Sequence, residues 1–365
     1  MTRQPPAWAR KMPIQPSSWR LIGLAAAVWL ALSLSTPMFN SVLNYQSMAF
    51  QVAEVGLFAL VIALSMLTSG IDLSIVSVAN LSAIVTAKVF VVIGATNGGV
   101  GALVLGVAVG LLVGAVCGLV NGLIITRLNV SPILATLGTM QLFNGIAVGW
   151  TNGEAVYGMP PAFLALGSGT VSGIPTPFLV FAVVAGIVAV LIARSGLGFR
   201  IRMIGANAVA SRFAGVPTRA VLVKAYLLCG LIAAVAGMVV SARTASANAD
   251  YGQSYVLLAI VIAVLGGTDP NGGRTSIPGV ALAALVLQMV ASGFNLLGLS
   301  QFTYQIAQGA ILIAVMGVAT LTGRLDWRRF LARPLPTVPA GSIESWDGPD
   351  APGSPTTPIE ERHTA

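Results

Sequence analysis

Residues able to carry charge-dependent chemistry are scarce in the central part of this chain. Between Arg20 and Gly323 the only acidic residues are Glu54, Asp72, Glu154, Asp250 and Asp269. The one histidine, His363, lies close to the C-terminus, and Cys117 and Cys229 each lie inside a long apolar run. Because no His, Cys and Asp cluster is available, the sequence indicates no metal site, no disulfide and no catalytic site of a membrane enzyme.

The lysines argue against ATP hydrolysis by this chain. An ATP-binding loop of the G-x-x-x-x-G-K-[ST] type needs a lysine after a glycine, and Lys11, Lys88 and Lys224 all follow other residues. A proton-coupled carrier would instead place ionisable groups within its membrane spans. Glu54 and Lys88 are the two that lie squarely within apolar runs, so a secondary carrier that uses Glu54 stays open as an alternative.

The composition places the chain in a membrane. Its residues are 56% hydrophobic and 8% charged, with a mean hydropathy of +0.88, against roughly 45–50% and about 25% in soluble domains. Because a membrane helix needs about 20 apolar residues, we predict an all-α, polytopic membrane protein with about ten transmembrane helices. The predicted spans are 20–38, 47–67, 73–93, 99–125, 132–150, 176–193, 220–241, 255–267, 277–298 and 304–323. We expect the eighth, which is short, to extend a few residues to either side.

The distribution of Lys and Arg predicts the orientation. With both termini in the cytoplasm, ten spans place every basic residue inside except Lys88 and Arg243, as the positive-inside rule requires. The net charge of +8 is then explained by topology, and no nucleic-acid partner is needed. We expect a cytoplasmic segment over 1–19, a membrane domain over 20–323 and a disordered, Pro-rich cytoplasmic tail over 324–365.

The stretch TSGIDLS, residues 68–74, places Asp72 between two apolar runs. We expect Gly70 to release the preceding helix, so that the Asp72 carboxylate can accept hydrogen bonds from the amides that open the next span. The alternative is direct contact with a polar substrate, because breaks in transporter helices are common places for polar sites.

Five glycines recur at every fourth position in the fourth span, at Gly106, Gly110, Gly114, Gly118 and Gly122. Glycine at this spacing lets helix backbones approach closely. We therefore expect this helix to contact more than one neighbour and to lie deep in the bundle.

A short surface helix is predicted in the basic loop after the sixth span. Asn207 is a good N-cap, Ala208 to Ala214 could form about two turns, and Gly215 with Pro217 supplies a stop. Two interpretations remain open, a merely helical positive-inside loop and an element that docks a partner.

The stretch LGGTDPNGGRTSIPG, residues 265–279, contains the preferred residues of a type I turn at 269–272. Turning explains Asp269 without chemistry. Without a lysine, the glycines Gly266, Gly267, Gly272 and Gly273 do not make a phosphate-binding loop.

Four stretches, in this order, resemble the membrane permease subunits of bacterial monosaccharide ABC importers of the ribose, xylose, arabinose, rhamnose and autoinducer-2 type. They are SGIDLSIVSV (69–78), NGLIITRLNVSPILATLGTM (121–140), GFRIRMIGANAVASRFAGV (198–216) and LGGTDPNGGRTSIPG (265–279). The resemblance runs from about Ala49 to Gly323 and implies a location in the bacterial inner membrane.

The resemblance implies partners and site residues. The partners are an ATP-binding cassette ATPase, which binds ATP and Mg, a periplasmic sugar-binding protein, a second permease copy or paralogue, and membrane lipid. The segment from Asn207 to Pro217 looks like the coupling helix, although Val209, Ala210 and Ser211 replace the usual Glu-Ala-Ala and leave the ATPase contact to shape, backbone and Arg212. Within the first two stretches, the residues that could line a substrate path are Gly70, Asp72, Ser74 and Asn121.

Three departures from the family pattern stand out. Ser69 and Val76 occupy positions where the family usually has glycine, and so does Thr275 in the later loop. They leave open whether the permease pairs with itself or with a different permease.

Overall fold

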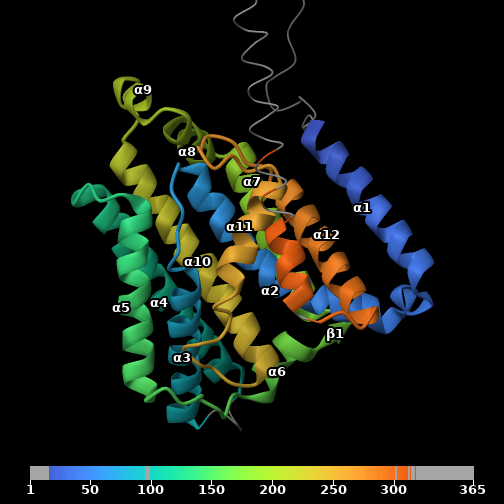
Figure 1. The fold of residues 1–365 in the computed structure, drawn as a ribbon. Coiled ribbons are helices and arrows are strands. Elements are labelled where there is room, and N and C mark those ends of the chain that lie inside the picture. Colours follow the sequence, from blue (N-terminus) through green and yellow to red (C-terminus); the bar gives the residue numbers. More distant parts are fainter. Residues whose placement is uncertain (1–15, 95–98, 301, 311–312, 314–316, 318–365) are drawn as a thin grey trace, which may run out of the picture. The chain divides into compact units, whose positions relative to one another are not determined.

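The computed structural model describes residues 16–94, 99–300, 302–310, 313 and 317, which lie almost entirely in the first of two units into which the chain divides, Met1–Met316. This unit is a bundle of helices (Figure 1). The helices are α1 (Pro16–Ser35), the 3-10 helix η2 (Pro37–Asn40), α2 (Val42–Leu67), α3 (Ile75–Ile93), α4 (Val100–Arg127), α5 (Pro132–Thr151), α6 (Pro161–Ser168), α7 (Thr176–Arg194), α8 (Gly196–Ala206), α9 (Ala208–Phe213), α10 (Thr218–Thr244), α11 (Tyr255–Leu265) and α12 (Ile277–Leu296).

In the described part of the chain, seven helices are long and apolar enough to cross a membrane: α2, α3, α4, α5, α7, α10 and α12. They correspond to seven of the predicted spans. Two further spans correspond to shorter apolar helices, Leu21–Ser35 within α1 and Tyr255–Leu265 in α11. The tenth is helical over 302–310, and most of its remainder lies outside the described residues, as do residues 1–15 of the predicted N-terminal segment and the predicted tail.

The expected extension of the eighth span is wrong. At 1.5 Å per residue the eleven residues of α11 rise only about 16 Å, roughly half of a bilayer core. The helix stops at Gly266, and Gly267 has a φ of +91°, a backbone conformation that favours glycine. After α11 the chain therefore continues as an irregular segment, residues 266–276, up to the start of α12.

Helix α2 forms the centre of the bundle, and nearly every residue from Val52 to Leu67 is buried. It contacts α7, α10, α11 and α12 along its length. A helix that is apolar on all sides is stable only when surrounded by other elements or by lipid, and here other helices surround it.

The glycine row of α4 performs the predicted close packing. A Cβ added at Gly106 would collide with Phe90 of α3, and one added at Gly114 would come within 2.5 Å of the carbonyl oxygen of Gly230 in α10. The helix thus contacts two neighbours, as predicted. Its predicted position deep in the bundle is wrong, because its other face exposes large apolar residues such as Leu105 and Leu112.

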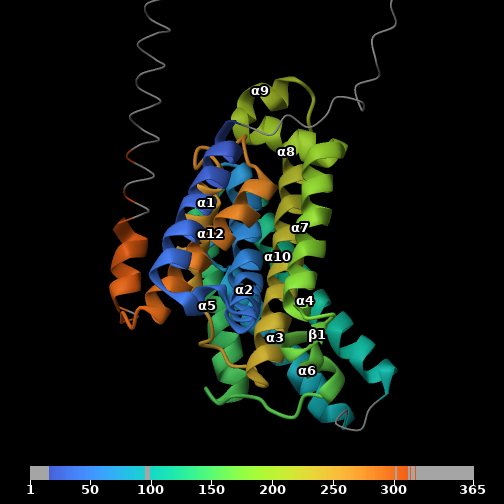
Figure 2. The same ribbon diagram turned by 90° about the vertical axis from the view of Figure 1, so that its right-hand side faces the viewer.

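The two ends of the bundle differ in their connections (Figures 1 and 2). At one end lie α8, α9 and the 265–276 loop. At the other lie α6 and a two-stranded hairpin, β1 (Thr170–Val171) paired antiparallel with β2 (Ile174–Pro175). Positive φ angles at Ser172 and Gly173 give the turn the twist that suits a two-residue hairpin.

Candidate functional site

The break between α2 and α3 is pinned at Ser69. Ser69 has a φ of +64°, so this serine, rather than the predicted Gly70, occupies the left-handed conformation that follows the end of α2. Its hydroxyl lies 2.7 Å from the carbonyl oxygen of Gly205 and 2.8 Å from that of Asn271. Ser69 therefore joins three of the four stretches that carried the family resemblance.

Gly70 serves a different purpose from the one predicted. A Cβ at this position would lie 2.7 Å from Pro132 and from the hydroxyl oxygen of Tyr226. The residue permits close approach of the break to α5 and α10.

Asp72 belongs to a small buried network at the start of α3. Its Oδ1 accepts hydrogen bonds from the amide (3.0 Å) and the hydroxyl (2.7 Å) of Ser74, and Asn121 donates to that hydroxyl at 2.8 Å. The Asp72 residue is only 3% exposed. The carboxylate thus accepts a hydrogen bond from the amide of Ser74, the residue immediately before α3. This is the predicted kind of contact, made one residue before the helix begins.

The loop at 265–279 forms the predicted turn. The amide of Gly272 donates to the carbonyl of Asp269 at 2.9 Å, and the Asp269 side chain accepts the amide of Asn271 at 3.0 Å. Gly272 and Gly273 have φ angles of +95° and +78°, and the amide of Gly273 donates to the carbonyl of Leu67 at 3.1 Å. At the loop's ends, a Cβ on Gly266 would come within 2.5 Å of Val280.

Two of the three departures from the family pattern, Ser69 and Thr275, form side-chain hydrogen bonds in this region. Besides Ser69, the hydroxyl of Thr275 lies 2.8 Å from that of Thr268, and both threonines are buried. The Ser69 hydroxyl therefore attaches the loop to the end of α2 alongside the main-chain bond of Gly273, and the Thr268–Thr275 bond closes the loop on itself.

The predicted surface helix is present as α9. The Asn207 side chain accepts the amide of Ala210 at 2.9 Å, and Gly215 adopts a φ of +75° with no neighbour near its Cβ position, which confirms the predicted cap and stop. Ser211 is buried and anchors α9, while Ala210 and Arg212 are exposed. Pro217 is the residue before α10.

One side of α9 presents large apolar groups to the outside. Val209 is 63% exposed and Phe213 is 90% exposed. Residues four apart lie on the same side of a helix, so these two form a single apolar contact surface.

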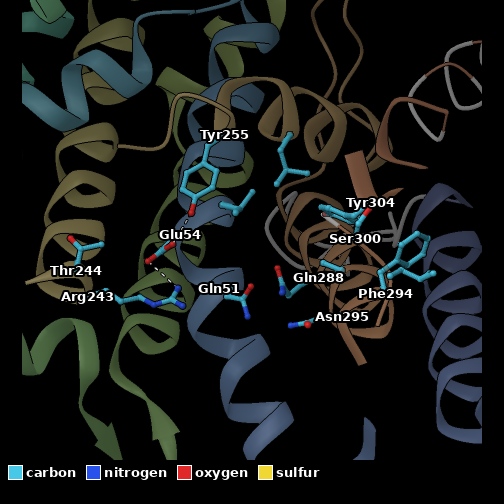
Figure 3. Close-up of a pocket in the computed structure, with 14 residues that line it drawn as sticks. Gln51, Glu54, Arg243, Thr244, Tyr255, Gln288, Phe294, Asn295, Ser300 and Tyr304 are labelled. Carbon is cyan, nitrogen blue, oxygen red and sulfur yellow. Dashed lines mark hydrogen bonds and ion pairs between the residues drawn. The ribbon is translucent and has the colours of Figure 1, made fainter. Parts of the chain in front are cut away.

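A polar cavity of about 630 Å³ lies among α2, α10, α11, α12 and the residues after α12 (Figure 3). The polar residues that line it are Gln51, Glu54, Arg243, Thr244, Tyr255, Gln288, Asn295, Ser300 and Tyr304. Phe294 adds an aromatic face beside Tyr304, with ring centroids 6.1 Å apart. A concave site with several convergent polar groups is the usual form of a small-molecule site.

The charged part of this cavity is an ion pair that joins three helices. Nη1 of Arg243 lies 3.0 Å from Oε1 of Glu54, and the hydroxyl of Tyr255 donates to Oε2 of Glu54 at 3.1 Å. The Glu54 residue is 5% exposed, whereas the Arg243 side chain is 33% exposed. Figure 3 shows Glu54 between Tyr255 and Arg243.

A second cavity of about 390 Å³ shares Arg243 with the first. It is bounded by the start of α2, including Ser47, and by the end of α6 at Gly167 and Ser168. The side-chain amide of Gln51, which lines the larger cavity, donates to the hydroxyl of Ser47 at 3.2 Å. Arg243 therefore lines both cavities, and the Gln51–Ser47 hydrogen bond connects a lining residue of one to a lining residue of the other.

The cavity was only partly predictable. The sequence distinguishes Glu54 by its charge within an apolar run, and the predicted orientation leaves Arg243 outside. Neither observation indicates that the two residues form an ion pair. The residues predicted for a substrate path, Gly70, Asp72, Ser74 and Asn121, are not among those that line the cavity. Their contact with a substrate stays a prediction.

In the described part of the chain, seven long apolar helices together with a polar cavity are typical of a multi-pass membrane protein of the transport class. The chain belongs to the family described as branched-chain amino acid transport system / permease component, whose model matches residues 44–316. It is thus a transmembrane permease component, with a role in transport rather than in catalysis.

Relatives in this family carry sugar-import names. The chain is 38% identical to the ribose import permease protein of Bacillus subtilis (strain 168), over 79% of this chain and 88% of that protein. It is 32% identical to the L-arabinose transport system permease protein of Escherichia coli (strain K12), over 80% and 87%. It is also 32% identical to the autoinducer 2 import system permease protein of Klebsiella pneumoniae, over 77% and 84%. No solved structure matches the chain.

Proposed function

We propose that this chain is the permease subunit of an ATP-driven, binding-protein-dependent importer of a monosaccharide or a similar small polyol. The observation that carries the proposal is the polar cavity inside an otherwise apolar bundle. Substrate would reach the cytoplasm by alternating access, as the bundle opens first to one side of the membrane and then to the other.

The chemistry of the cavity suits a neutral polyhydroxylated molecule. The amides of Gln51, Gln288 and Asn295 can each donate and accept hydrogen bonds, as sugar hydroxyls require. The amide nitrogen of Gln288 is buried without a hydrogen-bond partner among the described residues. A bound hydroxyl would satisfy such a group, whose burial alone is costly.

The energy source would be a separate ATPase subunit, which binds ATP and Mg and contacts α9. The apolar surface formed by Val209 and Phe213 supports this assignment. Two large exposed apolar side chains on a capped helix can be buried in a cleft of a partner protein. A loaded periplasmic sugar-binding protein would dock at the opposite end, near residues 151–175, and a second permease copy or paralogue would complete the pathway.

The distribution of basic residues supports an inner-membrane location with α9 in the cytoplasm. Arg127, Arg194 and Arg212 lie in the last turns of α4, α7 and α9. Arg243, one of the two predicted exceptions, lies in the last turn of α10, which runs away from α9. This arrangement is the one that the positive-inside rule favours.

Purification of the tagged chain from its native membranes, followed by mass spectrometry and by uptake of radiolabelled ribose and arabinose into proteoliposomes, tests the proposal. We expect an ATPase subunit to copurify and uptake to require ATP. The double substitution Asn207→Ala and Gly215→Val should abolish both. Gly94→Val is the matched control, because Gly94 also has a positive φ and open space around it. Unchanged uptake in the double variant would contradict the coupling role of α9.

A stand-alone secondary carrier is the second candidate, favoured by the buried charge of Glu54. It predicts uptake by the reconstituted chain alone and its loss on addition of a proton uncoupler at constant ATP. Uptake that needs ATP and the ATPase, and that resists the uncoupler, would exclude it.

A further inference from the structure

The charged groups that line the larger cavity cancel each other. Glu54 and Arg243 are its only ionised lining residues in the described part of the chain, and they form one ion pair. The other polar groups of the wall are amides and hydroxyls. A substrate in this cavity therefore meets a wall with no net charge.

Glu54 is held in place more firmly than Arg243. Both of its carboxylate oxygens have partners from other helices, Arg243 from α10 and Tyr255 from α11. The arginine side chain is one-third exposed and reaches both cavities. A guanidinium has five N–H donors, and one contact with Glu54 leaves donors that can face a substrate.

An anion that enters the cavity would encounter opposing forces. An unpaired guanidinium is a strong binder of carboxylate, which it can hold with two parallel hydrogen bonds. Here the Glu54 carboxylate already lies 3.0 Å from Arg243, so a second carboxylate must displace it or approach it with like charge. At short range inside a protein such repulsion is poorly screened.

We propose that the Glu54–Arg243 pair is a charge filter, which admits neutral sugars to the cavity and rejects the corresponding sugar acids. The inference rests on the proposed function and adds a specificity-determining residue to it. Glu54 supplies the rejection by neutralising Arg243, and Arg243 supplies hydrogen bonds to neutral hydroxyls. Because Arg243 lines both cavities, a substrate that moves from one to the other would contact the pair.

Binding of radiolabelled D-ribose and D-ribonate to the full chain in lipid nanodiscs tests the filter. Ribonate carries a carboxylate and, unlike ribose, forms no hemiacetal ring, so the comparison of ribonate binding among variants isolates the effect of charge. We expect the wild type to bind ribonate at least about tenfold more weakly than ribose, a ratio that corresponds to roughly 1.4 kcal/mol. In Glu54→Gln the ribonate affinity should rise by about tenfold or more, since Arg243 loses its carboxylate partner.

Two further variants check the origin of the effect. The double variant Glu54→Gln with Arg243→Gln should lose the gained ribonate binding, because the cationic group is gone. Asp250→Asn removes the same charge from an exposed position outside the cavity and should leave both affinities unchanged.

Each outcome bears on the filter separately from the transport proposal. Equal affinities of the wild type for ribose and ribonate would overturn it, and that comparison stands even when Glu54→Gln does not fold. Ribonate binding that is the same in Glu54→Gln as in the wild type would also overturn it. If the wild type binds neither probe but Glu54→Gln binds ribonate, the filter holds and ribose is excluded as the substrate.

Discussion

The two ends of the bundle are stabilised in different ways. At the α9 end, Ser69, Gly205 and Asn271 are joined through backbone carbonyls, and glycines bring the chain segments into direct contact. At the cavity end, side chains from separate helices meet across a hollow, and one ion pair links α2 to α10. The first construction favours a rigid connection to a partner, and the second leaves room for a substrate.

The largest loss of stability is expected from a substitution at the α9 end, where the chain segments are in direct contact. In Gly272→Ala the new Cβ would collide with the Ser69 hydroxyl and lie 2.7 Å from the Gly205 carbonyl oxygen, at a φ of +95°. We expect a loss of about 3 kcal/mol or more, from strain and overpacking together, seen as a lower unfolding temperature in detergent. Gly298→Ala, which has a positive φ but open space, should lose only about 1 kcal/mol. Equal losses would mean that the contact with Ser69 is unimportant.

A smaller loss is expected when the wall of the cavity is broken. Glu54→Ala leaves Arg243 and the Tyr255 hydroxyl without their shared partner. Breaking a buried pair costs roughly 3–5 kcal/mol, and the partial exposure of Arg243 reduces this to about 2 kcal/mol. Thermal unfolding of Glu54→Ala beside Glu154→Ala measures the difference. Identical unfolding temperatures would show that the pair is not needed for stability.

Loss of the α9 cap should have a local effect. Asn207→Ala removes the acceptor of the Ala210 amide and should cost about 1 kcal/mol of helix stability. Hydrogen exchange of a peptide covering residues 207–217 should quicken by about fivefold, with the global unfolding temperature unchanged. Asn207→Ser keeps a capping oxygen and should exchange nearly as slowly as the wild type. Fast exchange already in the wild type would contradict the structural role of the cap.

Removal of the exposed aromatic ring should change stability least. Phe213 is 90% exposed, so Phe213→Ser should alter the free energy of unfolding by less than about 0.5 kcal/mol. If α9 docks the ATPase, the same substitution should nevertheless abolish copurification of that subunit. Phe302→Ser, at another highly exposed position, is the control. Retained copurification in Phe213→Ser would assign the contact to other residues.

The same contrast explains which features were predictable. The cap at Asn207, the stop at Gly215 and the turn at Asp269 depend on neighbours within a few residues, so local sequence is sufficient. The contact between Tyr255 and Glu54 joins positions 201 residues apart, and no local pattern encodes it. The sequence does not predict that α4 faces outward, because a helix surface that contacts lipid is as apolar as one that contacts other helices. The role of Ser69 is not predictable from local sequence, because its left-handed backbone conformation is stabilised by hydrogen bonds to the carbonyls of Gly205 and Asn271, which are distant in the chain.

The segment between α10 and α11 is joined to the loop between α5 and α6 by a main-chain bridge, in which Val156 and Ala247 exchange two hydrogen bonds of 2.8 and 3.0 Å. Because these bonds use only backbone atoms, any residue except proline at position 156 keeps both of them, whereas Ala247 is buried in the core. The loop that contains Val156 can therefore change its side chains during evolution while Arg243 and Tyr255 keep their positions in the cavity. The surface of this loop and the lining of the cavity can diverge independently in such an arrangement.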